Sequence, residues 1–214
     1  MRISKALRLF AVAFMLVGVS LAADEFKIDP SHSAANFTVK HMLISTVHGR
    51  FSSVSGTIVF DEKDPSKCSV DAVIKADSIT TDNEGRDKHL KSADFFDVEK
   101  FPEITFKSKK VEKRGNQWVA IGTLTMKGVA KDVELPFEVA KLEGPRGTTI
   151  GVGATTELNR QDYGVSWSRK LDNGGMVVAD TVKIELNLEA RAPRPAAAAA
   201  PAAAAPAAAA PAKK

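Results

Sequence analysis

Alternation of apolar and polar residues is the feature that most restricts the fold of this chain. Between Phe26 and Ala190 the residues alternate with a period of two, which is the period of a strand with one buried face. The clearest runs are 133–139 and 182–188, where every second residue is apolar and the residues between are charged, polar or proline. Turn residues such as Asp64-Pro65 and the run 172–175 separate the strands. The pattern predicts antiparallel strands in a sandwich or a barrel.

Shorter runs extend the same prediction along the chain. Further strands are predicted around 37–41, 58–60, 70–76, 104–106 and 118–126, each with alternate residues apolar. Many strands with short turns fit a closed barrel, which has no exposed edge strands.

One stretch, Asp82–Phe96, breaks the alternation. It places Arg86, Leu90 and Ala93 at helical spacing, and Asp82 or Asn83 can cap a helix there. We therefore expect a short helix or helical loop between two strands, ending near Phe96.

The first 22 residues have the pattern of a secretory signal. A basic start is followed by the apolar run Leu9–Val19 and then by Ser20-Leu21-Ala22, which suits cleavage after Ala22. The apolar run is short for a bilayer span, so a membrane anchor is the second interpretation.

Residues 191–214 consist mainly of alanine interrupted by proline. Regular proline prevents a continuous helix, and alanine alone buries too little surface to order the segment. We expect a disordered, semi-extended tail, which leaves residues 23–190 as the folded domain.

The net charge of +4 comes from the two ends of the chain. Residues 1–22 hold three basic residues and residues 191–214 hold four, with no acid in either, so 23 basic and 26 acidic residues remain between them. A domain without excess Lys and Arg is not expected to bind nucleic acid.

The single cysteine, Cys68, excludes an internal disulfide. We interpret it as a small strand residue, with intermolecular pairing as the alternative.

Aromatic residues recur near the middle of the predicted strands. They are Phe37, Phe51, Phe60, Phe106, Trp118 and Phe137. They can pack as a solid core or line a ligand cavity, and periodicity alone does not decide between these two.

Several short motifs occur in a fixed order across the domain. They are Phe26–Ser33, Phe37–His41, Gly49–Phe51, Gly56–Asp61, Ser78–Thr81, Arg86–Ser92, Asp94–Asp97, Phe101–Phe106, Gly122–Val129 and Asn159–Gly164. In this order they resemble the YceI-like family of polyisoprenoid-binding proteins over nearly the whole domain.

The resemblance implies an extended, lipocalin-like antiparallel β-barrel in the periplasm that binds a polyisoprenoid or similar amphiphilic lipid without catalysis. An isoprenoid quinone or a polyprenyl phosphate would be held non-covalently, with no cofactor. Each buried methylene contributes about 0.8 kcal/mol, so a long chain needs little polar chemistry. The residues expected to line the interior are Phe37, Val39, Phe51, Ile58, Phe60, Ile104, Phe106, Trp118, Leu124 and Phe137.

Four residues are candidates for the lipid head group at the barrel mouth: His32, Arg86, His89 and Arg160. A guanidinium group suits an anionic head group, and Asp87 and Asp162 would orient the two arginines. Structural ion pairing is the alternative for both arginines. The histidine spacing matches no standard zinc pattern, so no metal is expected.

Two other functions stay open. An enzyme could act on a barrel-bound lipid with His32 or His89 as acid or base, although no G-x-S-x-G elbow is present. A solidly packed barrel would instead favour a ligand-free envelope interaction module. Lipid exchange would allow a transient membrane contact or a homodimer.

Overall fold

The computed structural model describes residues 23–145, 147–169 and 176–193. The predicted signal segment 1–22 and tail residues 194–214 lie outside the described residues. Within the described ranges the chain forms eleven strands, one α-helix and four 3-10 segments. The strands are β1 (Asp24–Ile28), β2 (Ala34–His41), β3 (Ser45–Phe51), β4 (Val54–Phe60), β5 (Ser69–Lys75), β6 (Ile79–Thr80), β7 (Glu103–Arg114), β8 (Gln117–Met126), β9 (Val129–Gly144), β10 (Gly147–Asn159) and β11 (Val178–Pro193). The helix is α1 (Glu84–Lys91), and the 3-10 segments are η1 (Pro30–His32), η2 (Pro65–Lys67), η3 (Ala76–Ser78) and η4 (Arg160–Tyr163).

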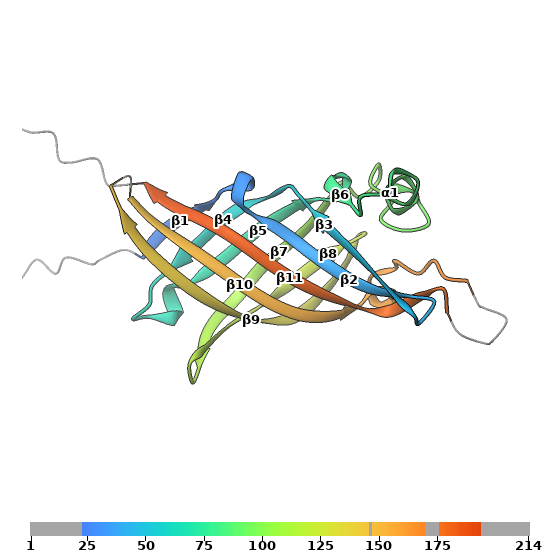
Figure 1. Ribbon diagram of the computed structural model, residues 1–214. Helices are drawn as coiled ribbons and strands as arrows, with labels where there is room; N and C mark the ends of the chain where they lie inside the picture. Colours follow the sequence, from blue (N-terminus) through green and yellow to red (C-terminus); the bar gives the residue numbers. More distant parts are fainter. Residues whose placement is uncertain (1–22, 146, 170–175, 194–214) are drawn as a thin grey trace, which may run out of the picture.

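The strands close into an antiparallel barrel (Figure 1). Eight strands follow one another in the ring, in the order β1-β4-β5-β7-β8-β9-β10-β11, and β11 pairs back with β1 through Lys27–Arg191 and Ile28–Ala190. The predicted all-β, lipocalin-like barrel is therefore confirmed. The buried core of the barrel is drawn from residues between Phe26 and Ala190.

The barrel is extended beyond this ring by a second set of pairings. η1 separates β1 from β2, and both strands run along β11. β2 then pairs with β3, and β3 pairs with β6 at Arg50–Thr80 and Phe51–Ile79. The long strands β9, β10 and β11 cross the whole length of the molecule (Figure 1).

The helical insertion is present but shorter than predicted. Asn83 caps α1 by accepting from the Arg86 N–H at 2.9 Å, and the helix ends at Lys91 rather than near Phe96. A left-handed residue at Asp97 (φ 50°) and turns from Ser92 onward replace the last expected turn. Ala93 therefore lies outside the helix.

Two further boundaries differ from the sequence prediction. Cys68 follows η2 and precedes β5, so it lies outside the strand. β11 extends to Pro193, three residues past the predicted domain end, because Arg191, Ala192 and Pro193 pair with the start of β10. No helix among the described residues is long and apolar enough to cross a membrane.

Candidate functional site

The barrel encloses an apolar cavity of about 140 Å³. Its wall is formed by inward-facing residues of most strands, from Ala35 on β2 to Leu188 on β11. Alternate residues of each strand point inward, so the apolar half of the sequence pattern becomes the wall. A cavity with so apolar a wall suits a hydrocarbon ligand.

Seven of the ten residues predicted to line the interior are part of this wall. They are Phe37, Phe51, Ile58, Ile104, Phe106, Leu124 and Phe137. Phe60, Trp118 and Val39 do not line the cavity. The ring of Phe60 packs edge-on against Trp118 at a centroid distance of 5.0 Å, and Trp118 stacks on Phe137 at 6.3 Å. Ligand contact by any of these residues stays a prediction.

The sequence reasoning missed the wall contributed by β10. Val152, Ala154, Thr156 and Leu158 line the cavity from this strand. This strand also contains glycines and threonines, which weaken the difference in polarity between its inward and its outward residues. The signal available in the sequence was the spacing of two between these residues, and in the folded chain Ala154 and Thr156 face Leu186 and Ile184 of one of the clearest alternating runs.

The two ends of the barrel differ in burial. At one end the residues Phe60, Trp118, Phe137, Ile150 and Ala190 are all buried, and we call this the aromatic end. At the other end the inward residues Met126, Val133, Leu158, Val182 and Ile184 are only half-buried. The interior is less tightly packed on this second side, which we call the open end. It carries the β2–β3, β8–β9 and β10–β11 connections.

The segment containing α1 packs on the barrel beside the open end (Figure 1). Leu90, Phe96 and Val98 contact the core, and the ring of Phe96 lies edge-on to Phe51 with centroids 5.4 Å apart. Since Phe51 lines the cavity, this segment contacts a residue of the cavity wall.

Asp87 fastens α1 to the strand before it. Its carboxylate accepts from the Thr81 N–H at 2.8 Å, the Thr81 hydroxyl at 2.5 Å and the Thr80 hydroxyl at 3.0 Å. Burial opposes ionisation of Asp87, but these hydrogen bonds outweigh it and lower the pKa of the carboxyl below its usual value. Arg86 donates to the Thr81 hydroxyl and carbonyl at 2.7 and 2.9 Å. The predicted head-group residue Arg86 is therefore engaged in the same anchor and does not line the cavity.

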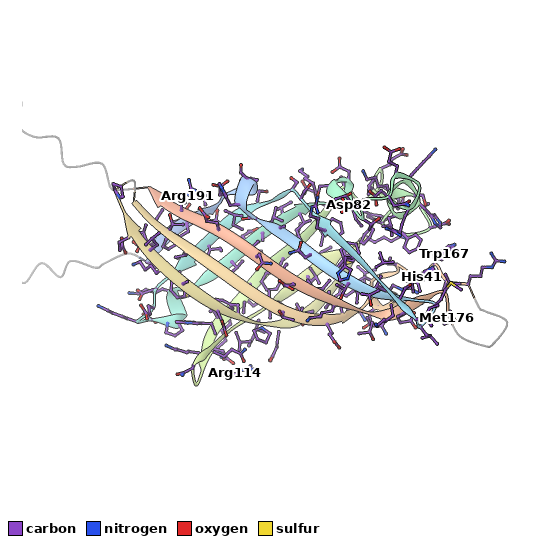
Figure 2. The ribbon with its side chains drawn as sticks, viewed as in Figure 1. His41, Asp82, Arg114, Trp167, Met176 and Arg191 are labelled. Atoms are coloured by element: carbon purple, nitrogen blue, oxygen red, sulfur yellow. The ribbon has the colours of Figure 1, made fainter. Side chains whose placement is uncertain are left out.

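His89 is a residue of α1 and belongs to an aromatic cluster that joins the helix to the β10–β11 connection. Its ring is edge-on to Phe95 at 5.0 Å and to Trp167 at 5.1 Å, and its Nε2 is 2.9 Å from Oδ2 of Asp94. Figure 2 shows Trp167 beside the helical segment. The predicted head-group residue His89 thus lies at the open end, joining two connections, but outside the cavity wall.

Arg160 is not available to a head group, because its guanidinium is buried and fully occupied. Only 6 % of the residue is exposed. All five guanidinium N–H groups have acceptors at 2.6–3.2 Å, namely the carbonyls of Val165, Trp167, Val178 and Ala179 and Oδ1 of Asp180. Burial lowers the pKa of Arg160, and the charge of Asp180 acts against that shift. Arg160 therefore makes a structural ion pair, which was the alternative to a head-group contact. Asp162 does not orient it but pairs with Lys131 at 3.3 Å.

His32 lies on the outside of the barrel, away from the cavity wall. Its Nδ1 is 3.1 Å from Oδ2 of Asp29, and Glu189 completes a His/Asp/Glu group whose ligand atoms lie within 4.8 Å of one another. The Arg191 guanidinium is 3.4 Å from Asp29 and 2.6 Å from Glu189, so a cation already neutralises these carboxylates. The cluster is a surface ion-pair network that ties η1 to β11.

A closed antiparallel barrel with an apolar interior open at one end defines the class of small lipocalin-like barrels. Residues 26–190 match the model of the YceI-like domain, and the chain belongs to the YceI-like family.

Relatives share the domain over most of their length. "Protein YceI" of Salmonella agona is 38 % identical over 164 residues, which cover 73 % of this chain and 84 % of that protein. "UPF0312 protein SA2479" of Staphylococcus aureus is 35 % identical over 167 residues, covering 77 % of this chain and 95 % of that protein.

Solved structures show the same barrel. Burkholderia cenocepacia BcnA superposes with a TM-score of 0.67 at 26 % identity, covering 76 % of this chain and 98 % of BcnA. A domain from Saccharophagus degradans, described as polyisoprenoid-binding, has a TM-score of 0.61 at 18 % identity and covers 80 % of this chain and 99 % of that domain. The latter likeness concerns the fold.

Proposed function

We propose that this protein is a non-enzymatic carrier that holds the chain of a polyisoprenoid or similar amphiphilic lipid in the barrel interior. The observation that carries the proposal is the apolar cavity, whose wall is continuous from the aromatic end to the half-buried residues of the open end. The description of the Saccharophagus degradans domain as polyisoprenoid-binding supports the same ligand class.

The size of the cavity indicates how such a chain would enter. Its volume of about 140 Å³ compares with about 150 Å³ for an apolar cavity that accepts benzene and with about 300–1,000 Å³ for pockets of drug-sized ligands. A long chain therefore needs the interior to widen. Met126 and Leu124 line the half-buried part of the wall, and methionine in particular changes conformation at little cost.

The composition of the cavity wall favours binding over catalysis. Among the described residues that line it, Glu134 is the only ionisable one. Its carboxylate accepts from Arg114 Nη1 at 2.6 Å and Nη2 at 3.0 Å and is thereby engaged. The histidines considered as acid or base, His32 and His89, lie outside the wall. The interior of the described barrel therefore offers hydrocarbon contact and no positioned acid–base pair.

Export to the periplasm is part of the proposal and rests on the predicted signal at residues 1–22. Mass determination of the protein recovered from the cell envelope tests it, with Ala23 expected as the first residue.

The proposed function is tested by identifying what the protein holds. Native mass spectrometry of protein purified without added lipid should show a bound species that organic solvent extracts, and added polyprenol or isoprenoid quinone should give a one-to-one complex. Protein that stays free of ligand in both measurements would overturn the proposal and favour the ligand-free interaction module.

A further inference from the structure

The turn between β2 and β3 presents three consecutive apolar residues to solvent. Met42, Leu43 and Ile44 are 40, 66 and 83 % exposed, and we call them the hairpin tip. Leu142 is the one other large apolar side chain with comparable exposure among the described residues, and it stands alone on β9. Single exposed apolar residues are common, whereas a contiguous group marks an interaction surface.

The backbone of the hairpin tip is unusual for these residue types. Met42 and Leu43 have φ of 52° and 65°, and the Ile44 N–H donates to the His41 carbonyl at 3.2 Å, which closes a β-turn with both central residues left-handed inside the three-residue connection between the partners His41 and Ser45. Asn-Gly is the favoured sequence for such a turn, because a left-handed residue with a Cβ costs about 1–2 kcal/mol. Bulky apolar residues here therefore cost conformational energy, and most of the surface of Leu43 and Ile44 stays exposed.

The hairpin tip stands at the open end of the barrel. The Met42 N–H donates to the Val177 carbonyl at 2.8 Å, which ties the tip to the residue that precedes β11. Figure 2 shows His41, which precedes the tip, and Met176 at the same extremity of the molecule. A surface bound by the tip would therefore face the open end of the barrel.

Basic residues flank the hairpin tip. Lys40 lies two residues before Met42 and is exposed. Arg169 is exposed and joins the same strand end, because its carbonyl accepts from the Val177 N–H at 2.8 Å. Asp180, the first acidic residue of β11, is already paired with Arg160. Apolar side chains bordered by cations match an anionic bilayer, where the first enter the acyl boundary and the second meet head groups.

We propose that the hairpin tip inserts into an anionic lipid bilayer and thereby seats the open end of the barrel against the membrane from which the lipid is taken. This inference rests on the proposed function, since it gives the route by which the cavity is loaded. The three tip side chains supply the affinity, and the barrel keeps its fold while docked.

The test uses the chain from Ala23 to Lys214, which contains the whole barrel and lacks the apolar segment 9–19. The variant is Met42→Asn/Leu43→Gly/Ile44→Thr, which installs the preferred turn sequence and should fold at least as well as the parent. The control is Leu142→Asn, which removes an equally exposed leucine from the aromatic end. Binding is measured by flotation with vesicles of equal parts phosphatidylcholine and phosphatidylglycerol, and loading by uptake of a fluorescent polyprenyl lipid from them.

We expect the parent and the Leu142→Asn control to float with the vesicles and to take up the labelled lipid. The tip variant should bind vesicles roughly tenfold more weakly or worse, yet bind the labelled lipid normally when it is delivered by detergent dilution. Equal vesicle binding by the parent and the tip variant, or none by either, would overturn the inference. Failure of all three proteins to bind detergent-delivered lipid would instead overturn the proposed function.

Discussion

The ring of Phe37 lies against Gly49, across the pair of strands β2 and β3. A Cβ atom at residue 49 would stand 2.3 Å from Cζ of Phe37, which is far inside van der Waals contact. The two residues are register partners, and Phe37 lines the cavity. The missing side chain of Gly49 therefore creates the space that the Phe37 ring fills, and it shapes this part of the wall.

Gly49→Ala should destabilise the barrel by about 1–3 kcal/mol, because the added methyl group forces the Phe37 ring out of its place. Urea unfolding measures the change. In a Phe37→Leu background the same substitution should cost clearly less, since the clashing ring atoms are gone. Equal costs in both backgrounds would show that Phe37 and Gly49 are not coupled.

Thr156→Phe should block the cavity while leaving the barrel folded. Thr156 lines the cavity on β10 and is half-buried, so an aromatic ring there occupies the space in which we propose that the lipid is held. The matched control is Thr155→Phe, one residue earlier on the exposed outer face. Titration with a fluorescent polyprenyl lipid should show at least a tenfold loss of affinity for Thr156→Phe and no comparable loss for Thr155→Phe. Similar affinity for both variants would mean that the ligand does not occupy this part of the interior.

Arg160→Lys should cost about 3 kcal/mol or more, although the charge is kept. A lysine has three donors on a flexible stem and cannot serve the five acceptors that surround the guanidinium. Asp180→Asn should cost less, about 1 kcal/mol, because that carboxylate is half exposed and the amide oxygen can still accept. Thermal and urea unfolding check the order. An Arg160→Lys variant as stable as Asp180→Asn would contradict the role assigned to the buried guanidinium.

The sequence predicted the barrel well and the polar residues poorly, for a physical reason. Burial of one strand face imposes a period of two, so the inward positions on β8, β9 and β11 can be read directly from the alternation. The partners of an arginine side chain follow no such periodicity in the sequence. Arg160 looks like a head-group ligand in the sequence, and only the folded chain brings four carbonyls and Asp180 around it.

The closing of the aromatic end was equally hidden from the sequence. Phe60, Trp118 and Phe137 have the same alternating context, yet Phe137 reaches the cavity and the other two do not. Which aromatic residue closes an end and which lines the cavity depends on the stagger of the strands around the barrel. The register of β8 with β9, which opposes Trp118 to Phe137, is a tertiary fact.

Acid should loosen the α1 segment through Asp87. The pKa of Asp87 is lowered in the folded protein, so its contribution to stability is complete above the ordinary carboxyl pKa and is lost as the pH falls through the lowered value. We expect hydrogen exchange of residues 81–91 to be constant from neutral pH to about pH 5, once corrected for its intrinsic pH dependence, and local protection to fall only below about pH 4.

The matched variant for this acid response is Asp87→Asn. It keeps the size of the side chain but removes the ionised acceptor of Thr80 and Thr81, and it should lower protection in this segment by about 1–3 kcal/mol at neutral pH. Its acid-dependent loss in the segment should be correspondingly smaller. If the native protein and Asp87→Asn lose protection over the same pH range and to the same extent, another group controls the segment.

Cys68 should be an inert thiol in the folded protein. It is 7 % exposed, and its Sγ accepts from the Asp61 N–H at 3.2 Å. Burial raises the pKa of the thiol, and the neighbouring charges of Asp61 and Asp64 add to the shift, so the reactive thiolate is scarce at neutral pH.

Ellman's reagent at pH 8 should therefore react with the native protein at least about a hundredfold more slowly than with the urea-unfolded chain, because both access and ionisation are restricted. Oxidation in air should leave the protein monomeric on a non-reducing gel. Rapid native labelling, or a dimer that disappears with reductant, would favour the intermolecular disulfide instead and would require the η2 region around Cys68 to open in the native state.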